Sequence, residues 1–133
     1  MSPKFSDSLR GYAHAVLKRD RFTCRYCGLD GTIWPNWLYL SWDHLLPKGN
    51  PKRDDPDFIV AACLFCNTAA NRTVWDVSGK TPDELVAQKK PVVLAVRERY
   101  REFWEKEVVP NEGADERFGI VTADVSAPPT RAT

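Results

Sequence analysis

The sequence predicts a small α+β domain held together by a metal ion. Two observations indicate this class. Short aromatic and apolar segments lie between stretches of helical periodicity, and the four cysteines form two Cys-x-x-Cys pairs. At 133 residues, 43% of them hydrophobic, the chain can bury one core but hardly two. We therefore expect one domain over residues 1–109 and a flexible C-terminal tail over residues 110–133.

The two cysteine pairs, Cys24/Cys27 and Cys63/Cys66, predict a structural zinc site. Each pair offers two sulfur atoms from one tight turn, so two pairs can complete a tetrahedron. Gly28 follows the first pair and can take the left-handed conformation that closes such a turn. Two disulfide bonds are the alternative. The first residues lack the basic and apolar regions of a signal peptide, so we expect a cytoplasmic protein with reduced thiols.

The charge is distributed unevenly along the chain. Residues 1–53 contain nine Lys or Arg against four Asp or Glu, and residues 54–133 contain ten against fourteen. A basic N-terminal half suits contact with the phosphates of a nucleic acid, although ordinary solvated surface charge would give the same counts. No stretch approaches the ~20 apolar residues of a membrane-spanning helix, so no membrane partner is expected.

Helices are expected on both sides of the cysteine region. Apolar residues recur at helical spacing over residues 8–20, and Thr81 followed by Pro82 and two acidic residues is typical of a helix start. Pro91 is expected to interrupt that second helix, and a longer one then runs to about residue 108. Its apolar face is expected to pack on the domain. That face comprises Val93, Val96, Tyr100, Phe103, Trp104 and Val108.

A strand, a loop and a second apolar segment are expected between the cysteine pairs. Residues 38–42 form a short aromatic strand that ends just before Asp43 and His44. Residues 47–57 contain three prolines and a glycine, which predicts an irregular loop. The apolar residues 58–62 then lead into the second cysteine pair.

A further helix is expected to start near Leu64. It would carry Asn67 and Asn71 on one face, because they are four residues apart.

Asp43, His44 and Asn67 together offer the chemistry of phosphodiester hydrolysis. That reaction needs a base for water and a cation for the negative charge that develops on the phosphate oxygens. The His44 imidazole can supply the base, because its reference pKa of about 6.5 is near the working range. Asp43 and Asn67 carry hard oxygen ligands, which suit Mg²⁺ or Mn²⁺. The sequence thus predicts Zn²⁺ for folding and an exchangeable divalent ion for catalysis.

The order of these blocks resembles the HNH endonucleases, a family of ββα-metal nucleases. The blocks are Cys-x-x-Cys, Asp-His-x-x-Pro and Val-x-x-Cys-x-x-Cys-Asn, within about residues 21–75. The resemblance implies a ββα-metal core with a structural zinc site and metal-dependent DNA cleavage, here flanked by the helices at about 8–20 and 82–108. It also implies that His44 is the general base, that Asp43 and Asn67 bind the catalytic ion, and that Asn71 is a further candidate ligand. The four cysteines match the zinc site that many members possess.

DNA is the partner that the resemblance implies, and the basic residues around the motif are the candidate contacts. They are Lys48, Lys52, Arg53 and Arg72. The biological setting stays open between phage DNA packaging, restriction and homing, and a phage terminase or another DNA-processing protein is a possible partner. In each setting the protein would be of phage or bacterial origin.

One position departs from the family pattern. Where a middle Asn is usual, this sequence has Phe58, preceded by Asp57. Phe58 opens an apolar run, so we predict that it packs in the core. The Asp57 carboxylate can accept backbone N–H bonds as an Asn carbonyl would, so we predict that it holds the loop carrying His44.

Two other classes of protein share part of the pattern. A non-catalytic, zinc-stabilised DNA-binding module would use the same cysteines and the basic half, with Asp43 and His44 as part of a capped turn. An iron-tetrathiolate electron carrier would share the cysteine turns but has no need of His44 or Asn67. Divalent-dependent nicking of plasmid DNA separates a nuclease from the first class, and a colourless protein excludes the second.

Overall fold

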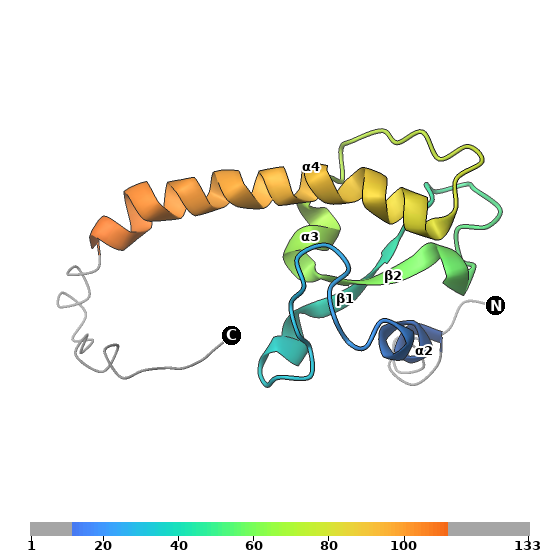
Figure 1. Ribbon diagram of the computed structural model, residues 1–133, viewed down its shortest axis with the longest axis horizontal. Coiled ribbons are helices and arrows are strands. Elements are labelled where there is room, and N and C mark those ends of the chain that lie inside the picture. Colours follow the sequence, from blue (N-terminus) through green and yellow to red (C-terminus); the bar gives the residue numbers. More distant parts are fainter. Residues whose placement is uncertain (1–11, 112–133) are drawn as a thin grey trace. The chain divides into compact units, whose positions relative to one another are not determined.

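A computed structural model describes residues 12–111 (Figure 1). The chain divides into two units, Met1–Ala95 and Val96–Thr133. In order, the elements are α2 (Tyr12–Arg19), the 3₁₀ turn η1 (Asn36–Tyr39), β1 (Leu40–His44), the 3₁₀ turn η2 (Pro56–Phe58), β2 (Ile59–Cys63), α3 (Leu64–Ala69), α4 (Pro82–Phe103) and the π-helical turn η3 (Trp104–Val108). Among these, no helix is long and apolar enough to span a membrane.

This order of strands and helices confirms the α+β class. The helix predicted over residues 8–20 is present from Tyr12, and its expected start lies outside the described residues. The helix predicted after the second cysteine pair is α3. From residue 112 on, the predicted tail also lies outside the described residues.

The sheet of the first unit consists of β1 and β2 in antiparallel pairing. Leu40 lies opposite Cys63, and His44 lies opposite Ile59. β2 is buried along its whole length, and α3 packs against both strands. The strand predicted over residues 38–42 begins two residues late because η1 occupies residues 36–39. Asp43 and His44 therefore lie within the strand, and the alternation of a strand directs their side chains to opposite faces.

The core of the first unit joins the cysteine turns to the sheet and to the first half of α4. Its largest fully buried side chains include Tyr26, Val60 and Val93. Leu85 of α4 is buried in the same cluster as Val93. The packing of α4 against the cysteine region thus brings a helix from late in the chain next to residues from its start.

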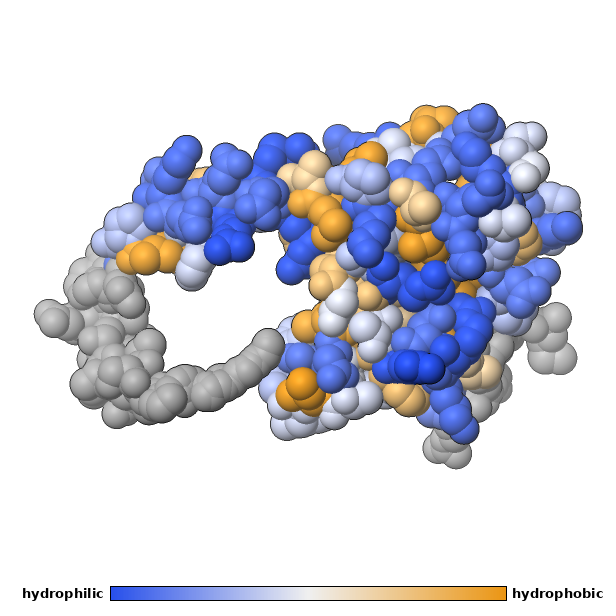
Figure 2. Space-filling view, in the orientation of Figure 1, coloured by the Kyte–Doolittle hydropathy of each residue, from blue (hydrophilic) through white to orange (hydrophobic). Residues whose placement is uncertain are grey.

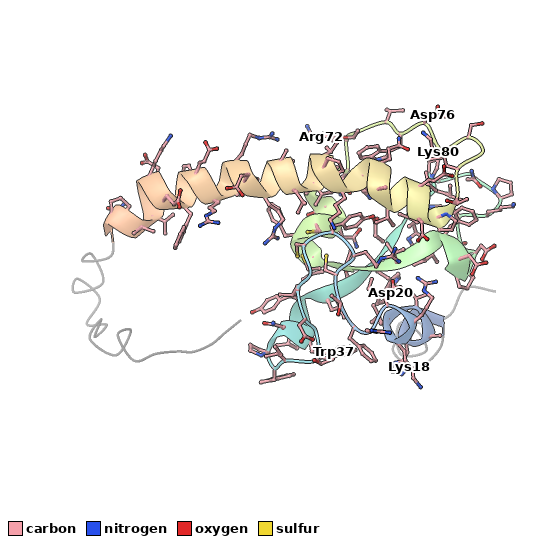
Figure 3. All side chains as sticks on the ribbon, viewed as in Figure 1. Lys18, Asp20, Trp37, Arg72, Asp76 and Lys80 are labelled. Carbon is pink, nitrogen blue, oxygen red and sulfur yellow. The ribbon has the colours of Figure 1, made fainter. Side chains whose placement is uncertain are left out.

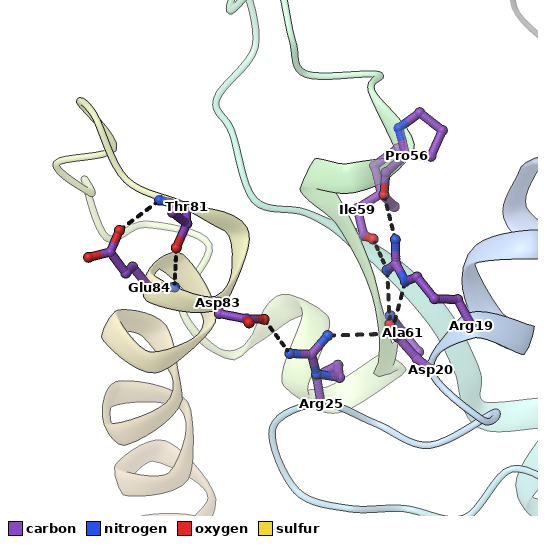
Figure 4. Close-up of polar contacts among 9 residues, drawn as sticks. All are labelled: Arg19, Asp20, Arg25, Pro56, Ile59, Ala61, Thr81, Asp83 and Glu84. Atoms are coloured by element: carbon purple, nitrogen blue, oxygen red, sulfur yellow. Dashed lines mark hydrogen bonds and ion pairs between the residues drawn. The ribbon is translucent and has the colours of Figure 1, made fainter.

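The predicted start of α4 is confirmed, but the predicted interruption at Pro91 is wrong. Thr81 and Glu84 form a capping box: the Glu84 N–H donates to Thr81 Oγ1 at 3.2 Å, and the Thr81 N–H donates to Glu84 Oε1 at 2.9 Å (Figure 4). Pro91 is exposed inside a continuous helix. Leu85 and Val93 are buried on either side of it, and their burial offsets the ~3 kcal/mol that a helical proline costs.

The predicted apolar face of α4 is not packed beyond its first residues. Val93 is buried, whereas Tyr100, Phe103 and Trp104 are 64%, 62% and 50% exposed. Figure 2 shows hydrophobic surface near the end of the described helix. The second unit thus carries large apolar side chains on its surface.

Asp20 ties α2 to the sheet and, through arginine, to the start of α4 (Figure 4). Its carboxylate accepts the Ala61 N–H at 2.8 Å and pairs with Arg19 at 3.1 Å and Arg25 at 3.4 Å. Arg19 also donates to two backbone carbonyls at η2 and the start of β2. Arg25 reaches Asp83 at 3.2 Å. These contacts connect the end of α2 to β2 and to the start of α4.

Candidate metal centre and catalytic cleft

The sulfur atoms of the four cysteines lie close together, between the first cysteine turn and α3 (Figure 3). All four sulfur atoms lie within 4.8 Å of one another, and Sγ of Cys27 is 3.8 Å from Sγ of Cys63. A tetrahedron with metal–sulfur bonds of about 2.3 Å has edges of about 3.8 Å. The cysteines are free thiols. They could therefore hold a metal ion such as zinc, as predicted, and the disulfide alternative is wrong.

Both cysteine turns have the same local geometry. The Cys27 N–H donates to Cys24 Sγ at 3.5 Å, and the Cys66 N–H donates to Cys63 Sγ at 3.4 Å. Gly28 has φ +81°, the left-handed conformation that was predicted, and its N–H donates to the Cys24 carbonyl at 3.0 Å. Hydrogen bonds among the four thiols lower the pKa of Cys24 and raise the pKa of Cys63 and of Cys66.

A cleft of about 670 Å³ in the first unit is lined by the three predicted catalytic residues, Asp43, His44 and Asn67. The polar residues that line it are Asp43, His44, Lys48, Arg53, Asn67, Asn71, Thr73 and Lys89. Of the four basic residues expected to contact DNA, Lys48 and Arg53 therefore lie at the cleft. Lys52 and Arg72 are exposed and lie outside its lining.

His44 is partly buried at the cleft, with Nε2 3.5 Å from Asp54 Oδ1. Burial first, and then the charge of Arg53, lower the pKa of His44, while Asp54 and Asp43 oppose that shift. The imidazole is consequently neutral at neutral pH and able to accept a proton.

The loop before β2 is held by residues other than Asp57, so that prediction is wrong. Asp55 caps η2, because its carboxylate accepts the Asp57 N–H at 2.9 Å. The Asp57 side chain is exposed, and the carboxylate that faces His44 belongs to Asp54. Phe58 packs against the core, as predicted, and its carbonyl accepts the Leu45 N–H at 2.9 Å.

Asp43 is buried and already has a cationic partner. Its Oδ2 accepts the Tyr26 O–H at 2.7 Å and pairs with Lys89 Nζ at 2.6 Å. The Lys89 ammonium also lies 5.6 Å from the centre of the Tyr26 ring. Burial first, and then the charge of Asp43, raise the pKa of Tyr26, so its hydroxyl stays protonated and donates.

Asn67 connects α3 to β1. Its Nδ2 donates to Ser41 Oγ at 3.0 Å and to the Trp42 carbonyl at 2.9 Å. A carbonyl can only accept, so the amide nitrogen must face β1, and Oδ1 is the atom that could bind a cation. The expectation that Asn71 shares a helix face with Asn67 is wrong, because α3 ends at Ala69. Asn71 nevertheless lines the cleft from the turn that follows.

The comparisons with known proteins give one partial similarity. Over 63 residues the chain is 27% identical to the Type 4 apparatus protein DotN of Legionella pneumophila. The matched segment makes up 47% of this chain and 26% of that protein. The chain thus spans about a quarter of the length of the curated relative it matches. No family model and no solved structure matches the chain.

Sequence reasoning missed three residues of the site. Tyr26 could have been noticed, because it stands between two cysteines of the candidate metal site. Asp54 is one of five charged residues in the segment from Lys52 to Asp57, both included, and nothing in that segment distinguishes it. Lys89 carries no local signal, since its partner is 46 positions away.

Proposed function

We propose that the protein is a metal-dependent DNA endonuclease of the HNH type, with His44 as the general base. The observation that carries this proposal is the cleft, which is lined by His44 and Asp43 of β1, by Asn67 of α3 and by basic side chains. A base, two hard oxygen ligands and cations for phosphate are the parts that phosphodiester hydrolysis requires.

His44 would take the proton from the attacking water. Its lowered pKa keeps the ring neutral, and its place at the cleft gives access to solvent. Asp54, 3.5 Å from Nε2, would restrict the orientation of the ring. A general base of this kind contributes ~10²–10⁴ in rate.

Asp43 and Asn67 would hold the divalent ion, with Asn71 as a further ligand from the same cleft. Asp43 Oδ1 and Asn67 Oδ1 fit Mg²⁺ or Mn²⁺ in kind, since both are hard oxygen donors. When bound, the ion would stabilise the charge that develops on the phosphate and on the leaving oxygen.

Arg53 and Lys48 would hold the phosphate backbone in the cleft. Within the described chain, Nε of Arg53 is buried without a hydrogen-bond partner, and Nη1 is 3.9 Å from Asp54. A buried donor without a partner is unfavourable, and a phosphate oxygen is an acceptor of the right charge. Lys52 and Arg72, exposed outside the cleft lining, would contact more distant phosphates.

A second candidate function is a non-catalytic, zinc-stabilised DNA-binding module. The pairing of Asp43 with Lys89 favours it, because that carboxylate already has a cation. The partial similarity to a protein named for the type 4 apparatus also fits a domain that works within an assembly.

Cleavage of supercoiled plasmid by the zinc-loaded protein, with Mg²⁺ or Mn²⁺, tests the proposal. His44→Ala should lower the rate by ~10²–10⁴. His14→Ala is the matched control, because His14 is the other histidine and does not line the cleft. If His44→Ala cuts as fast as the parent, His44 is not the base. If the parent binds plasmid but cuts it with neither metal, the second candidate stands.

A further inference from the structure

We infer that Lys89 is a positioning residue that competes with the divalent ion for Asp43 and thereby sets the metal affinity of the cleft. The inference rests on the proposed function, because it concerns the carboxylate that would bind that ion. Lys89 Nζ lies 2.6 Å from Asp43 Oδ2, and both side chains are buried. Each also lines the cleft.

A buried carboxylate is stabilised by one compensating positive charge, and Lys89 supplies it. A divalent ion on Asp43 would have to approach an ammonium group that bonds to the other oxygen of the same carboxylate. Repulsion between two cations is strong where water is largely excluded. The ion is therefore bound more weakly while Lys89 Nζ stays 2.6 Å from Oδ2.

The position of Lys89 is fixed by the packing of α4. Leu85 and Val93 are buried on either side of it in the same helix, and the Tyr26 ring lies beside its ammonium group. The competing charge is therefore built into the fold rather than carried by a mobile surface chain. On this inference, the packing of α4 against the first cysteine turn sets the affinity of the cleft for a divalent ion.

The test is a Mn²⁺ titration of the zinc-loaded protein without nucleic acid, with free Mn²⁺ read by electron paramagnetic resonance. Lys89→Met removes the charge and keeps most of the volume, and it should tighten Mn²⁺ binding by at least about tenfold. Tyr26→Phe is the matched control: it removes a hydrogen bond to the same Oδ2 without changing charge, and its effect should be less than about threefold.

The added affinity must depend on Asp43. In the double variant Asp43→Asn with Lys89→Met, the tighter binding should disappear, and its persistence would show that the charge acts elsewhere. Zinc content and thermal unfolding establish that each variant is folded. If Lys89→Met does not fold, Lys89→Gln serves in its place, because its amide can still donate to Asp43. Equal Mn²⁺ affinity in the parent and in the folded Lys89 variant overturns the inference.

The inference and the proposed function can fail separately. A protein that cleaves plasmid through His44, but whose Mn²⁺ affinity ignores Lys89, keeps the proposed function and loses the inference. A protein that cleaves nothing, but binds Mn²⁺ more tightly when Lys89 is replaced, keeps the inference and loses the nuclease activity.

Discussion

The four-cysteine site and the cleft are arranged in opposite ways. At the cysteines, ligands of one kind face each other within 4.8 Å, and backbone N–H groups support the sulfur atoms. In the cleft, the candidate ligands also hold the protein together: Asp43 pairs with Lys89 and Tyr26, and Asn67 binds β1. A closed set of soft ligands suits a permanent ion, whereas ligands shared with the fold suit an ion that exchanges.

The largest effect should come from breaking the sulfur site. Cys63→Ser should abolish zinc binding and unfold the domain, since structural zinc contributes apparent binding free energies on the order of 10 kcal/mol. Metal analysis and thermal unfolding measure this. Leu64→Ser is the control, because Leu64 is the exposed neighbour and offers no ligand. A stable, zinc-free Cys63→Ser protein would contradict the structural role of the site.

A smaller effect, on the free energy of unfolding, should distinguish Asn67 from Asn71. Asn67→Ala removes two hydrogen bonds to β1 and should lower the free energy of unfolding by about 2 kcal/mol, about 1 kcal/mol for each bond. Asn71→Ala, in an exposed turn, should change it by less than about 0.5 kcal/mol. Urea unfolding gives both values. Equal losses would mean that Asn67 does not connect α3 to the sheet.

The smallest effect should be on the pH at which cleavage falls, which two substitutions near His44 should shift in opposite directions. A base must be neutral, so cleavage should fall as the pH drops through the pKa of His44, which lies below its usual 6.5. Arg53→Gln removes a charge that lowers this pKa and should move the fall to higher pH. Asp54→Asn removes a charge that raises it and should move the fall to lower pH. Asp54 is largely exposed, so both shifts should be modest and should shrink with added salt.

Cleavage rate against pH, at low and high salt, checks this pair. The two variants serve as controls for each other, since their side chains are neighbours at the edge of one loop. Shifts in the same direction would show that His44 is not the group whose titration limits the rate.

Local patterns predicted the parts of the fold that depend on neighbouring residues. The cysteine spacing, the Gly28 conformation and the Thr81 cap were all readable in this way. The start of β1 was not, because η1 is held by a side-chain bond from Asn36 to the Asp30 carbonyl at 3.1 Å. The sequence also did not predict that α4 continues through Pro91, because this depends on the burial of its apolar side chains against distant segments.

The candidate site was predictable as a set of residues but not as a set of contacts. Asp43, His44 and Asn67 follow from motif spacing, and the structure brings them to one cleft. The contacts of these residues decide how freely their side chains can bind an ion, and the main partner, Lys89, lies on a helix that comes much later in the chain. Such pairings require the tertiary structure.

The place of Tyr26 between Cys24 and Cys27 couples the cysteine site to the cleft. Its hydroxyl donates to Asp43 at 2.7 Å, so the shape of the first cysteine turn sets where one of the two partners of this carboxylate lies. If the four thiols bind a metal ion, its loss would therefore alter the surroundings of Asp43 as well as those of the sulfur atoms.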